Sequence, residues 1–308
     1  MAVAPQNQAL RKPNSLQRRR MIGDYLLLAP QLILYIGLTI LPFFVAIPVL
    51  FTDRLHFQDT GVENIGWANF TRIFTDSNIQ QEFLPALQRT LTFVSLNYLM
   101  VYVFGLTLAL LIYEIGFNSW FFTIVYLPMM ASGLATGYMA TMLFSRSTGT
   151  INLMLHELFN IQREIDIQLP TGTTILLPIM IGWKYAGFNV ALFLSGLLGI
   201  STETIEAATV DGASYWQRLW RVYFPQMIPS FIIATIFCLI GSFGVFEELI
   251  PLGALSSNNE ARLLSVIFFN YAFSSQRLAL GLVLTLETFL PLVVVALFLQ
   301  RLQRRLQY

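Results

Sequence analysis

Six long apolar windows constrain the fold of this 308-residue chain more than any other feature. They lie at 25–51, 90–113, 119–144, 173–200, 227–246 and 278–300. About 20 helical residues cross a hydrocarbon layer about 30 Å thick, and each window reaches that length. Only 11% of the residues are charged, against about a quarter in soluble domains. The sequence therefore predicts an all-α polytopic membrane protein with six transmembrane helices and excludes a water-soluble globular domain.

The first window follows three arginines, Arg18, Arg19 and Arg20, as the apolar part of a secretory signal peptide also would. Such apolar parts span only about 7–15 residues, whereas this window has 27. We therefore expect a retained helix rather than a cleaved leader.

Basic residues favour an orientation with both termini in the cytoplasm. The segments 1–24, 114–118, 201–226 and 301–308 then lie inside and carry 10 Lys or Arg residues, against 7 in the outer segments. Cytoplasmic loops of membrane proteins carry such an excess. The predicted organisation is a cytoplasmic tail over 1–24, a transmembrane domain over 25–300 and a cytoplasmic tail over 301–308.

Two outer segments, 52–89 and 145–172, are too long for simple turns. The first contains Trp67, Phe70 and Phe74 at nearly helical spacing. Small caps, a partner surface and interfacial helices with an aromatic belt are all open interpretations.

Several functional classes lack the residues that they need. Lys12 and Lys184 are the two lysines, and neither follows a glycine-rich phosphate loop, so this chain should not hydrolyse ATP. His56 and His156 have no metal ligands at a suitable spacing, and we expect no metal site. The single cysteine, Cys238, excludes an intrachain disulfide. A net charge of +1 gives no sign of nucleic acid binding.

The loop 201–225, between the fourth and fifth windows, is more structured than a linker. Its first half contains good helix formers, and Gly212 can adopt the left-handed conformation that ends a helix. Ser214 and Gln217 form a capping box for a second helix, which Pro225 stops. The loop therefore predicts two short helices joined at Gly212.

The second of these helices is predicted to be amphipathic. Trp216, Leu219, Trp220 and Tyr223 fall at i, i+3, i+4 and i+7, which places them on one apolar face. A cytoplasmic apolar face has to be covered. The residues alone leave two coverings open, the lipid interface and a protein partner.

A composite motif surrounds this loop. It consists of Glu206-Ala207-Ala208, Asp211-Gly212-Ala213-Ser214, Pro225 and Pro229, preceded by Trp183 and Leu194-Ser-Gly-Leu-Leu-Gly-Ile200. The composite resembles the EAA signature of ABC importer permeases, in the branch that imports sugars, oligosaccharides and polyols. Similar segments elsewhere are Gly66-Trp-Ala-Asn-Phe70, Leu127-Pro128 and Asn270-Tyr-Ala-Phe273, so the resemblance covers nearly the whole chain.

The resemblance implies a set of partners. It implies a second, usually non-identical permease subunit, two cytoplasmic ATPase subunits that bind ATP and Mg²⁺, and an extracytoplasmic solute-binding protein. It also implies that the hairpin docks in a cleft of the ATPase, where Glu206 would pair with a basic residue and Gly212 would form the turn. The coupling residues that it implies are Glu206, Ala207, Ala208, Asp211, Gly212 and Ala213.

The chain departs from the family pattern in three places. Ser201 stands where a proline usually precedes the first coupling helix, and Phe224-Pro225 replaces Leu-Pro. After the fifth window, 251–259 replaces a Gly-Gly-Pro stretch. Because this last segment faces outside, it bears on the identity of the solute or of the binding protein.

Lys184 and Glu287 are the ionisable residues within the predicted spans. A charge at the bilayer centre costs several kcal/mol unless it has a partner or water. Their depths of about 16 and 14 Å permit an ion pair between them, and a cavity-lining role is the alternative. Glu247 and Glu248, after the fifth window, are expected to be solvated.

Residue types around Lys184 suit a sugar, whose apolar face stacks on aromatic rings while its hydroxyls form hydrogen bonds. The candidate cavity residues are Trp183, Lys184, Tyr185, Asn189 and Glu287.

These features predict an inner-membrane permease subunit of a binding-protein-dependent ABC importer, which moves a sugar-like solute by alternating access. The chain itself would perform no bond chemistry. A second hypothesis is an ion-coupled secondary transporter that uses a Lys184–Glu287 pair. A third, an intramembrane enzyme, lacks a nucleophile and base. Within the first hypothesis, an amino acid, a phosphate ester or a compatible solute is the alternative cargo.

Overall fold

The structure is a computed structural model that describes residues 15–116, 119–161, 165–256 and 258–306. Every regular element in these ranges is a helix, and Thr52 and Asn64 form one isolated antiparallel bridge. The prediction of an all-α chain is therefore confirmed. The predicted tails, 1–24 and 301–308, extend beyond the described ranges.

Within these ranges, three helices are long and apolar enough to cross a membrane unbroken. They correspond to the first, second and sixth apolar windows. In the first two, a π-helical stretch joins two α-helices. The three consist of α1 (Ser15–Tyr35) with α2 (Leu41–Val49), α4 (Ser77–Met100) with α5 (Thr107–Ile115), and α16 (Leu278–Leu306).

Three further spans contain a bend, which the hydropathy pattern did not predict. Hydropathy reports how long an apolar stretch is but not the direction of its helix axis. Counting each bent pair as one span gives up to six spans. The bends are 92° between α6 (Ser119–Tyr126) with its 3₁₀ turn and α7 (Gly133–Phe144), 58° between α9 (Pro170–Lys184) and α10 (Ala186–Leu198), and 66° between the helix over Tyr215–Gln226 and α14 (Ile228–Phe243).

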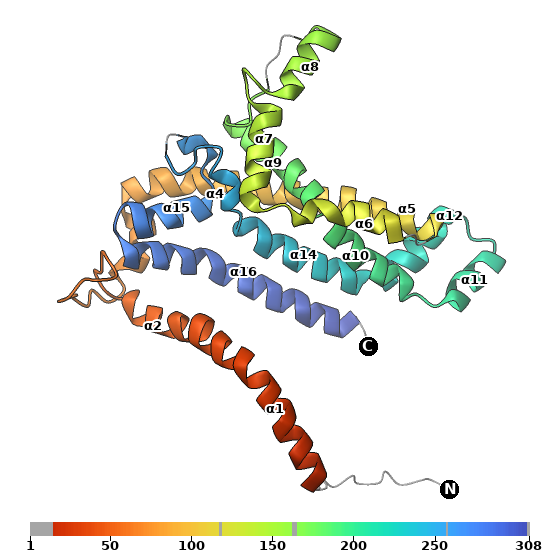
Figure 1. The fold of residues 1–308 in the computed structure, drawn as a ribbon, viewed down its shortest axis with the longest axis horizontal. Coiled ribbons are helices and arrows are strands. Elements are labelled where there is room, and N and C mark those ends of the chain that lie inside the picture. Colours follow the sequence, from red (N-terminus) through yellow and green to blue (C-terminus); the bar gives the residue numbers. More distant parts are fainter. Residues whose placement is uncertain (1–14, 117–118, 162–164, 257, 307–308) are drawn as a thin grey trace.

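The sharpest bend follows from the residues between α6 and α7. Pro128 lies in a 3₁₀ turn, and the chain is extended at Ala131 and Ser132. The Ser132 hydroxyl accepts a hydrogen bond from the Ala135 N–H at 3.1 Å, so it caps a new helix in a new direction. As a result α7 leaves the direction of α6 and leads to α8 (Thr150–Phe159), which projects from the rest of the chain in Figure 1.

The second span begins at Ser77 rather than at residue 90, because polar residues hide its first turns from a hydropathy search. The Asp76 side chain caps it by accepting from the Asn78 N–H at 2.9 Å. The outer segment is therefore shorter than the predicted 52–89. It contains one short helix, α3 (Ala68–Thr75).

Glycines set the close approach of the central helices. α4 packs against α9 and α14, and α10 packs against α5 and the π-helical stretch before it. A Cβ added at Gly105 would lie 2.5 Å from Asn189 Cβ, and one added at Gly182 would lie 2.5 Å from Met100 Cβ. Small residues commonly permit such contact between membrane helices. The polar residues at this junction form the site described below.

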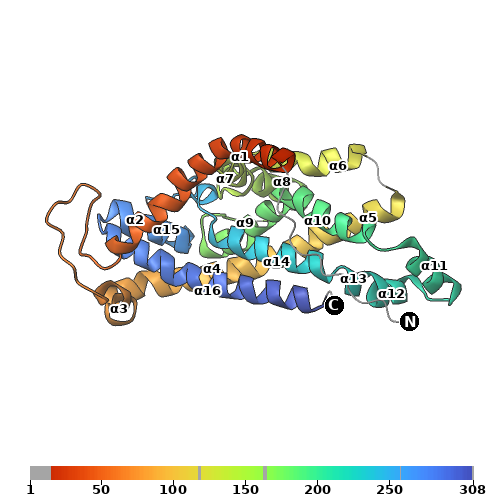
Figure 2. The same cartoon turned by 90° about the horizontal axis from the view of Figure 1, so that it is seen from below.

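The first span stands away from the rest of the chain in Figure 1, and in the view from below in Figure 2 it passes in front of the bundle. It spans the 27 residues Gly23–Val49, and its apolar 18-residue stretch has a mean hydropathy of 2.4 with none of it buried. An apolar surface of this size is stable only in hydrocarbon or against another protein. The subunit therefore offers a complete helix to the bilayer or to a partner.

Candidate functional site

The loop 201–225 forms a helical hairpin at one end of the bundle (Figure 1). The first helix, α11 (Thr202–Val210), is capped by Ser201, and the second begins with α12 (Tyr215–Arg218). Between them Gly212 has φ of +77°, a conformation that favours glycine. Ser214 and Gln217 form the predicted capping box. The prediction of two short helices joined at Gly212 is confirmed.

Four of the six proposed coupling residues, Glu206, Ala207, Asp211 and Gly212, are exposed, and Ala208 and Ala213 are half-buried. One contact bridges the two helices of the hairpin, since Arg218 Nη1 donates to Thr209 Oγ1 at 2.7 Å. The hairpin therefore holds its shape while its tip faces away from the bundle.

The prediction of a single apolar face on the second helix is wrong, because two of the four side chains are buried and two are exposed. Leu219 and Tyr223 are buried against the bundle, whereas Trp216 and Trp220 are 66% and 64% exposed. The helix widens to a π-helical stretch over Leu219–Tyr223, which changes the angular spacing of these side chains from that of an α-helix. The helix then continues through α13 (Phe224–Gln226), so it ends one residue beyond Pro225.

Tyr223 joins the hairpin to the end of the second span. Its ring packs edge-to-face on Tyr113 of α5, with centroids 6.0 Å apart. Burial raises the pKa of the Tyr223 hydroxyl, and the neighbouring Tyr113 and Glu114 add to the shift. The base of the hairpin is thus packed on the end of α5.

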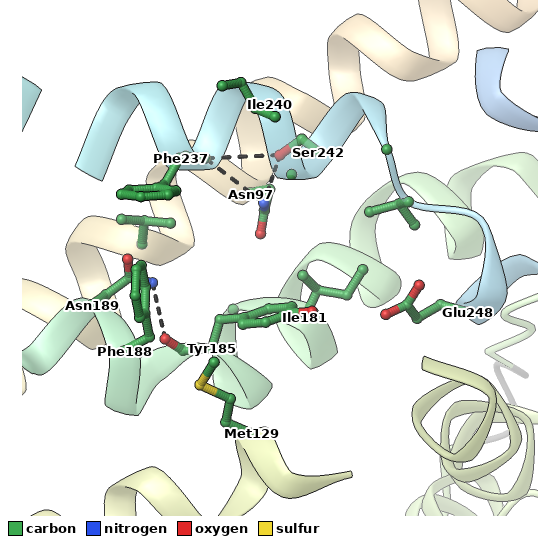
Figure 3. A pocket seen from close by; sticks show the side chains of 16 residues that line it. Asn97, Met129, Ile181, Tyr185, Phe188, Asn189, Phe237, Ile240, Ser242 and Glu248 are labelled. Carbon is green, nitrogen blue, oxygen red and sulfur yellow. Dashed lines mark hydrogen bonds between the residues drawn. The ribbon is translucent and has the colours of Figure 1, made fainter. Parts of the chain in front are cut away.

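A cavity of about 360 Å³ lies among α4, the α9–α10 bend and α14. Its wall is mostly apolar, which is typical of small-molecule sites with a few placed polar groups. Figure 3 shows the residues that line it. The polar ones are Asn97, Tyr185, Asn189, Ser242 and Glu248.

The structure pairs Lys184 with Glu248, whose Oε1 lies 3.1 Å from Lys184 Nζ. Both side chains are buried, and Lys184 Nζ also lies 5.1 Å from the centroid of the Tyr185 ring. The hypothesis of a Lys184–Glu287 pair within the subunit is therefore wrong, as is the expectation that Glu248 is solvated. Glu247 is exposed, as expected.

The sequence did not predict Glu248 as a cavity residue, because the direction of its side chain depends on a turn. After α14 the chain enters a 3₁₀ turn over Glu247–Leu249, which directs one glutamate outward and the next inward. This turn packs tightly on α7, since a Cβ at Gly137 would lie 2.4 Å from the Glu248 carbonyl oxygen.

The five candidate cavity residues lie in different places. Tyr185 and Asn189 line the cavity, and Lys184 lies behind its wall. Trp183 is 43% exposed and, like Glu287, does not line the cavity. Glu287 lies on α16, where its Oε2 is buried with no hydrogen-bond partner among the described residues.

Sequence reasoning missed three cavity residues that lie together. Asn97 Nδ2 donates to Ser242 Oγ at 2.8 Å and lies 3.7 Å from Cys238 Sγ. An amide and a hydroxyl within two apolar windows are a signal of this kind, because buried polar groups in a membrane need partners. No group of three potential metal ligands gathers anywhere in the part of the chain that the structure describes.

Known proteins are similar to this chain in sequence and in fold. The family described as binding-protein-dependent transport system inner membrane component matches residues 101–308. The probable starch degradation products transport system permease protein AmyD of Thermoanaerobacterium thermosulfurigenes is 28% identical over 281 residues, 89% of this chain and 91% of that protein. The sn-glycerol-3-phosphate permease UgpA of Rhizobium meliloti is 26% identical over 234 residues, 74% and 77% of the two chains.

The fold is similar to that of a chain in a crystal structure of a bacterial ABC transporter involved in import of the acidic polysaccharide alginate. The TM-score is 0.76 at 24% identity, and the match covers 93% of this chain and 96% of the other. A related structure of the alginate transporter holds a pentasaccharide-bound periplasmic protein in complex. With more than half of its residues matched by the family, this chain belongs to the inner-membrane components of binding-protein-dependent transport systems, the multi-pass permease subunits of ABC importers.

Proposed function

We propose that this permease carries a sugar, an oligosaccharide or a polyol-like solute through the cavity among α4, α9, α10 and α14. The names of its relatives support this class of cargo, because they include permeases for starch degradation products, arabinooligosaccharides and multiple sugars. Aromatic rings beside amide and hydroxyl groups suit a solute with apolar ring faces and many hydroxyls.

The hairpin 201–225 is the contact with the ATPase in this proposal. The observation that carries it is the combination of an exposed tip and a buried base. Glu206 and Gly212 face away from the bundle, while Leu219 and Tyr223 are anchored in it. A lipid-bound hairpin would need a continuous apolar face, whereas here the charged Glu206 and Asp211 and the small Gly212 interrupt the exposed apolar side chains. Docking on a protein fits these residues better.

The partners follow from the same proposal. Two ATP-binding subunits hold ATP and Mg²⁺, a second permease subunit completes the membrane domain, and an extracytoplasmic binding protein delivers the solute. The exposed first span supports a second permease, because it leaves a complete apolar helix uncovered. The chain lies with its tails, 1–24 and 301–308, in the cytoplasm, as the excess of basic residues favours.

Transport proceeds by alternating access in this scheme. ATP binding on the partner subunits closes them and moves the hairpin. The Tyr223–Tyr113 contact carries that movement to α5. The bends at Tyr185, between α9 and α10, and at Met227, between the hairpin and α14, are the positions where these helices can reorient. Hydrolysis and release reset the hairpin, so the cavity faces each side in turn.

The test is co-purification of the affinity-tagged chain in mild detergent, followed by mass spectrometry and an ATPase assay. A P-loop ATPase and a second six-span protein should co-purify. Glu206→Lys should lower ATPase recovery or uncouple hydrolysis from uptake. Glu203→Lys, with the same charge change on the same exposed helix, should behave like wild type.

Recovery of the chain alone, or wild-type uptake in Glu206→Lys, would contradict the proposal. The ion-coupled alternative loses its structural basis, because Lys184 pairs with Glu248 rather than with Glu287.

A further inference from the structure

Glu248 and Lys184 differ in their position relative to the cavity. Among the described residues that line the cavity, Glu248 is the one with an acidic or basic side chain. Lys184 does not reach the cavity. It lies behind the wall, 4% exposed, with Nζ held between Glu248 Oε1 and the ring of Tyr185. The solute therefore meets a carboxylate whose charge is compensated by Lys184 outside the wall, and no cation among the described residues that line the cavity.

Asn97 adds a second acceptor to the wall. Its side chain is 6% exposed, and its Nδ2 is committed to Ser242 Oγ and Cys238 Sγ. Its Oδ1 is buried without a hydrogen-bond partner in the described structure. Figure 3 shows this oxygen directed into the cavity, away from Ser242. A buried acceptor without a donor is unfavourable, and a donor on a bound solute would remove that cost.

The amide of Asn189, another polar group on the wall, offers little to an anion. Asn189 Nδ2 donates to the Tyr185 carbonyl at 3.1 Å, so a donor that would suit a carboxylate or phosphate is already used. Phe188 and Phe237, edge-to-face with centroids 5.4 Å apart, line the same cavity with apolar surface. Such surroundings strengthen electrostatic interactions, because little water screens them.

We infer that this cavity selects uncharged, hydroxyl-rich solutes and excludes carboxylated and phosphorylated ones, an inference that rests on the proposed function. Hydroxyls donate to Glu248 and Asn97, whereas an anion would meet a carboxylate and an unpaired amide oxygen. The relatives include a permease named for sn-glycerol-3-phosphate, which is an anion. We expect this chain to reject cargo of that class.

The experiment measures binding to the importer complex, purified through the tagged chain without its binding protein, in lipid nanodiscs. The probes are maltose and arabinobiose as uncharged solutes, and digalacturonate and glycerol 3-phosphate as anions. The readout is the shift in thermal unfolding temperature with probe concentration, which reports ligand affinity. The uncharged probes should raise the unfolding temperature, and the anions should not at equal concentrations.

Three variants sharpen the test. Glu248→Gln removes the carboxylate and frees Lys184, so affinity for the anions should rise by about tenfold or more. The double variant Lys184→Met with Glu248→Gln removes both charges and should show no such gain. Asn97→Leu should weaken the uncharged probes and leave the anions unbound. Glu247→Gln, outside the cavity, is the matched control and should behave like wild type.

Failure of the inference and failure of the cavity as the solute site give different results. Wild-type binding of the anions as tightly as the uncharged probes would overturn the inference and leave the proposed function standing. Binding of neither class, in a complex that still hydrolyses ATP, would overturn the cavity as the solute site and the inference with it.

Discussion

Lys184 Nζ and Glu248 Oε1 lie 3.1 Å apart in the interior of the bundle, although 64 positions separate the two residues in the chain. The pair joins the end of α9, at its bend with α10, to the turn that follows α14. The bend between α9 and α10 is therefore fixed to the turn at the end of α14. The same contact places a carboxylate on the wall of the cavity.

Breaking this pair should destabilise the fold. Lys184→Met or Glu248→Ala leaves the other charge buried and uncompensated, which costs about 3–5 kcal/mol. Thermal unfolding of the purified chain in detergent measures the loss. Replacing both residues with methionine should restore most of the stability, because no lone charge remains. An effect of Glu248→Ala no larger than that of Glu247→Ala would show that the pair contributes nothing.

Gly212 should be intolerant of a side chain because of its backbone conformation. At φ of +77°, a valine is strained by about 1–2 kcal/mol, so the turn should open and uncouple ATP hydrolysis from uptake. The ratio of hydrolysis to transport in the reconstituted importer is the measurement. Gly61→Val, at φ of +81° in an outer loop, imposes the same strain away from the hairpin. Equal ratios in the two variants would contradict a coupling role for the turn.

Gly105 should be required for the contact of α10 with the second span. A Cβ there would lie 2.5 Å from Asn189 Cβ, so Gly105→Leu should force the helices apart and lower the yield of folded protein. Gly37 has no heavy atom within 4 Å of an added Cβ. Fluorescence size-exclusion profiles of both leucine variants compare them directly. A monodisperse Gly105→Leu variant with wild-type thermal stability would refute the packing role.

Asn69 should fasten the outer end of the first span. Its side chain is 1% exposed, and Nδ2 donates to the carbonyls of Leu50 and Thr52 at 3.1 and 2.8 Å. Asn69→Leu leaves these acceptors unpaired at a cost of about 1–3 kcal/mol. Limited proteolysis should then cleave the 52–66 segment faster than in wild type. The exposed Asn78 provides the control substitution Asn78→Leu, and equal cleavage rates in both variants would argue against the tether.

The number of spans and the hairpin could be predicted because each depends on local sequence. Apolar length determines a span, and glycine, serine and glutamine at fixed spacing determine the turn at Gly212. The bends could not be predicted from composition. The 92° bend depends on the extended backbone at Ala131 and Ser132, which apolar neighbours on both sides conceal.

Only some of the cavity residues could be predicted, because the others depend on how separate spans pack together. Tyr185 and Asn189 stand beside a conspicuous intramembrane lysine, which draws attention to them. Glu248 and Asn97 belong to other spans, and only the tertiary fold brings them to that lysine. Depth alone favoured Glu287 as the partner of Lys184, because depth along the membrane normal says nothing about which helix is adjacent.

ATP-dependent uptake by the reconstituted importer tests the central claim most directly. The complex is purified through the tagged chain, placed in proteoliposomes with its binding protein, and supplied with labelled maltose or arabinobiose. We expect uptake only with ATP on the side of the hairpin, and its loss in Gly212→Pro while ATP hydrolysis persists. Uptake by liposomes that contain this chain alone, driven by a proton or sodium gradient, would contradict the account.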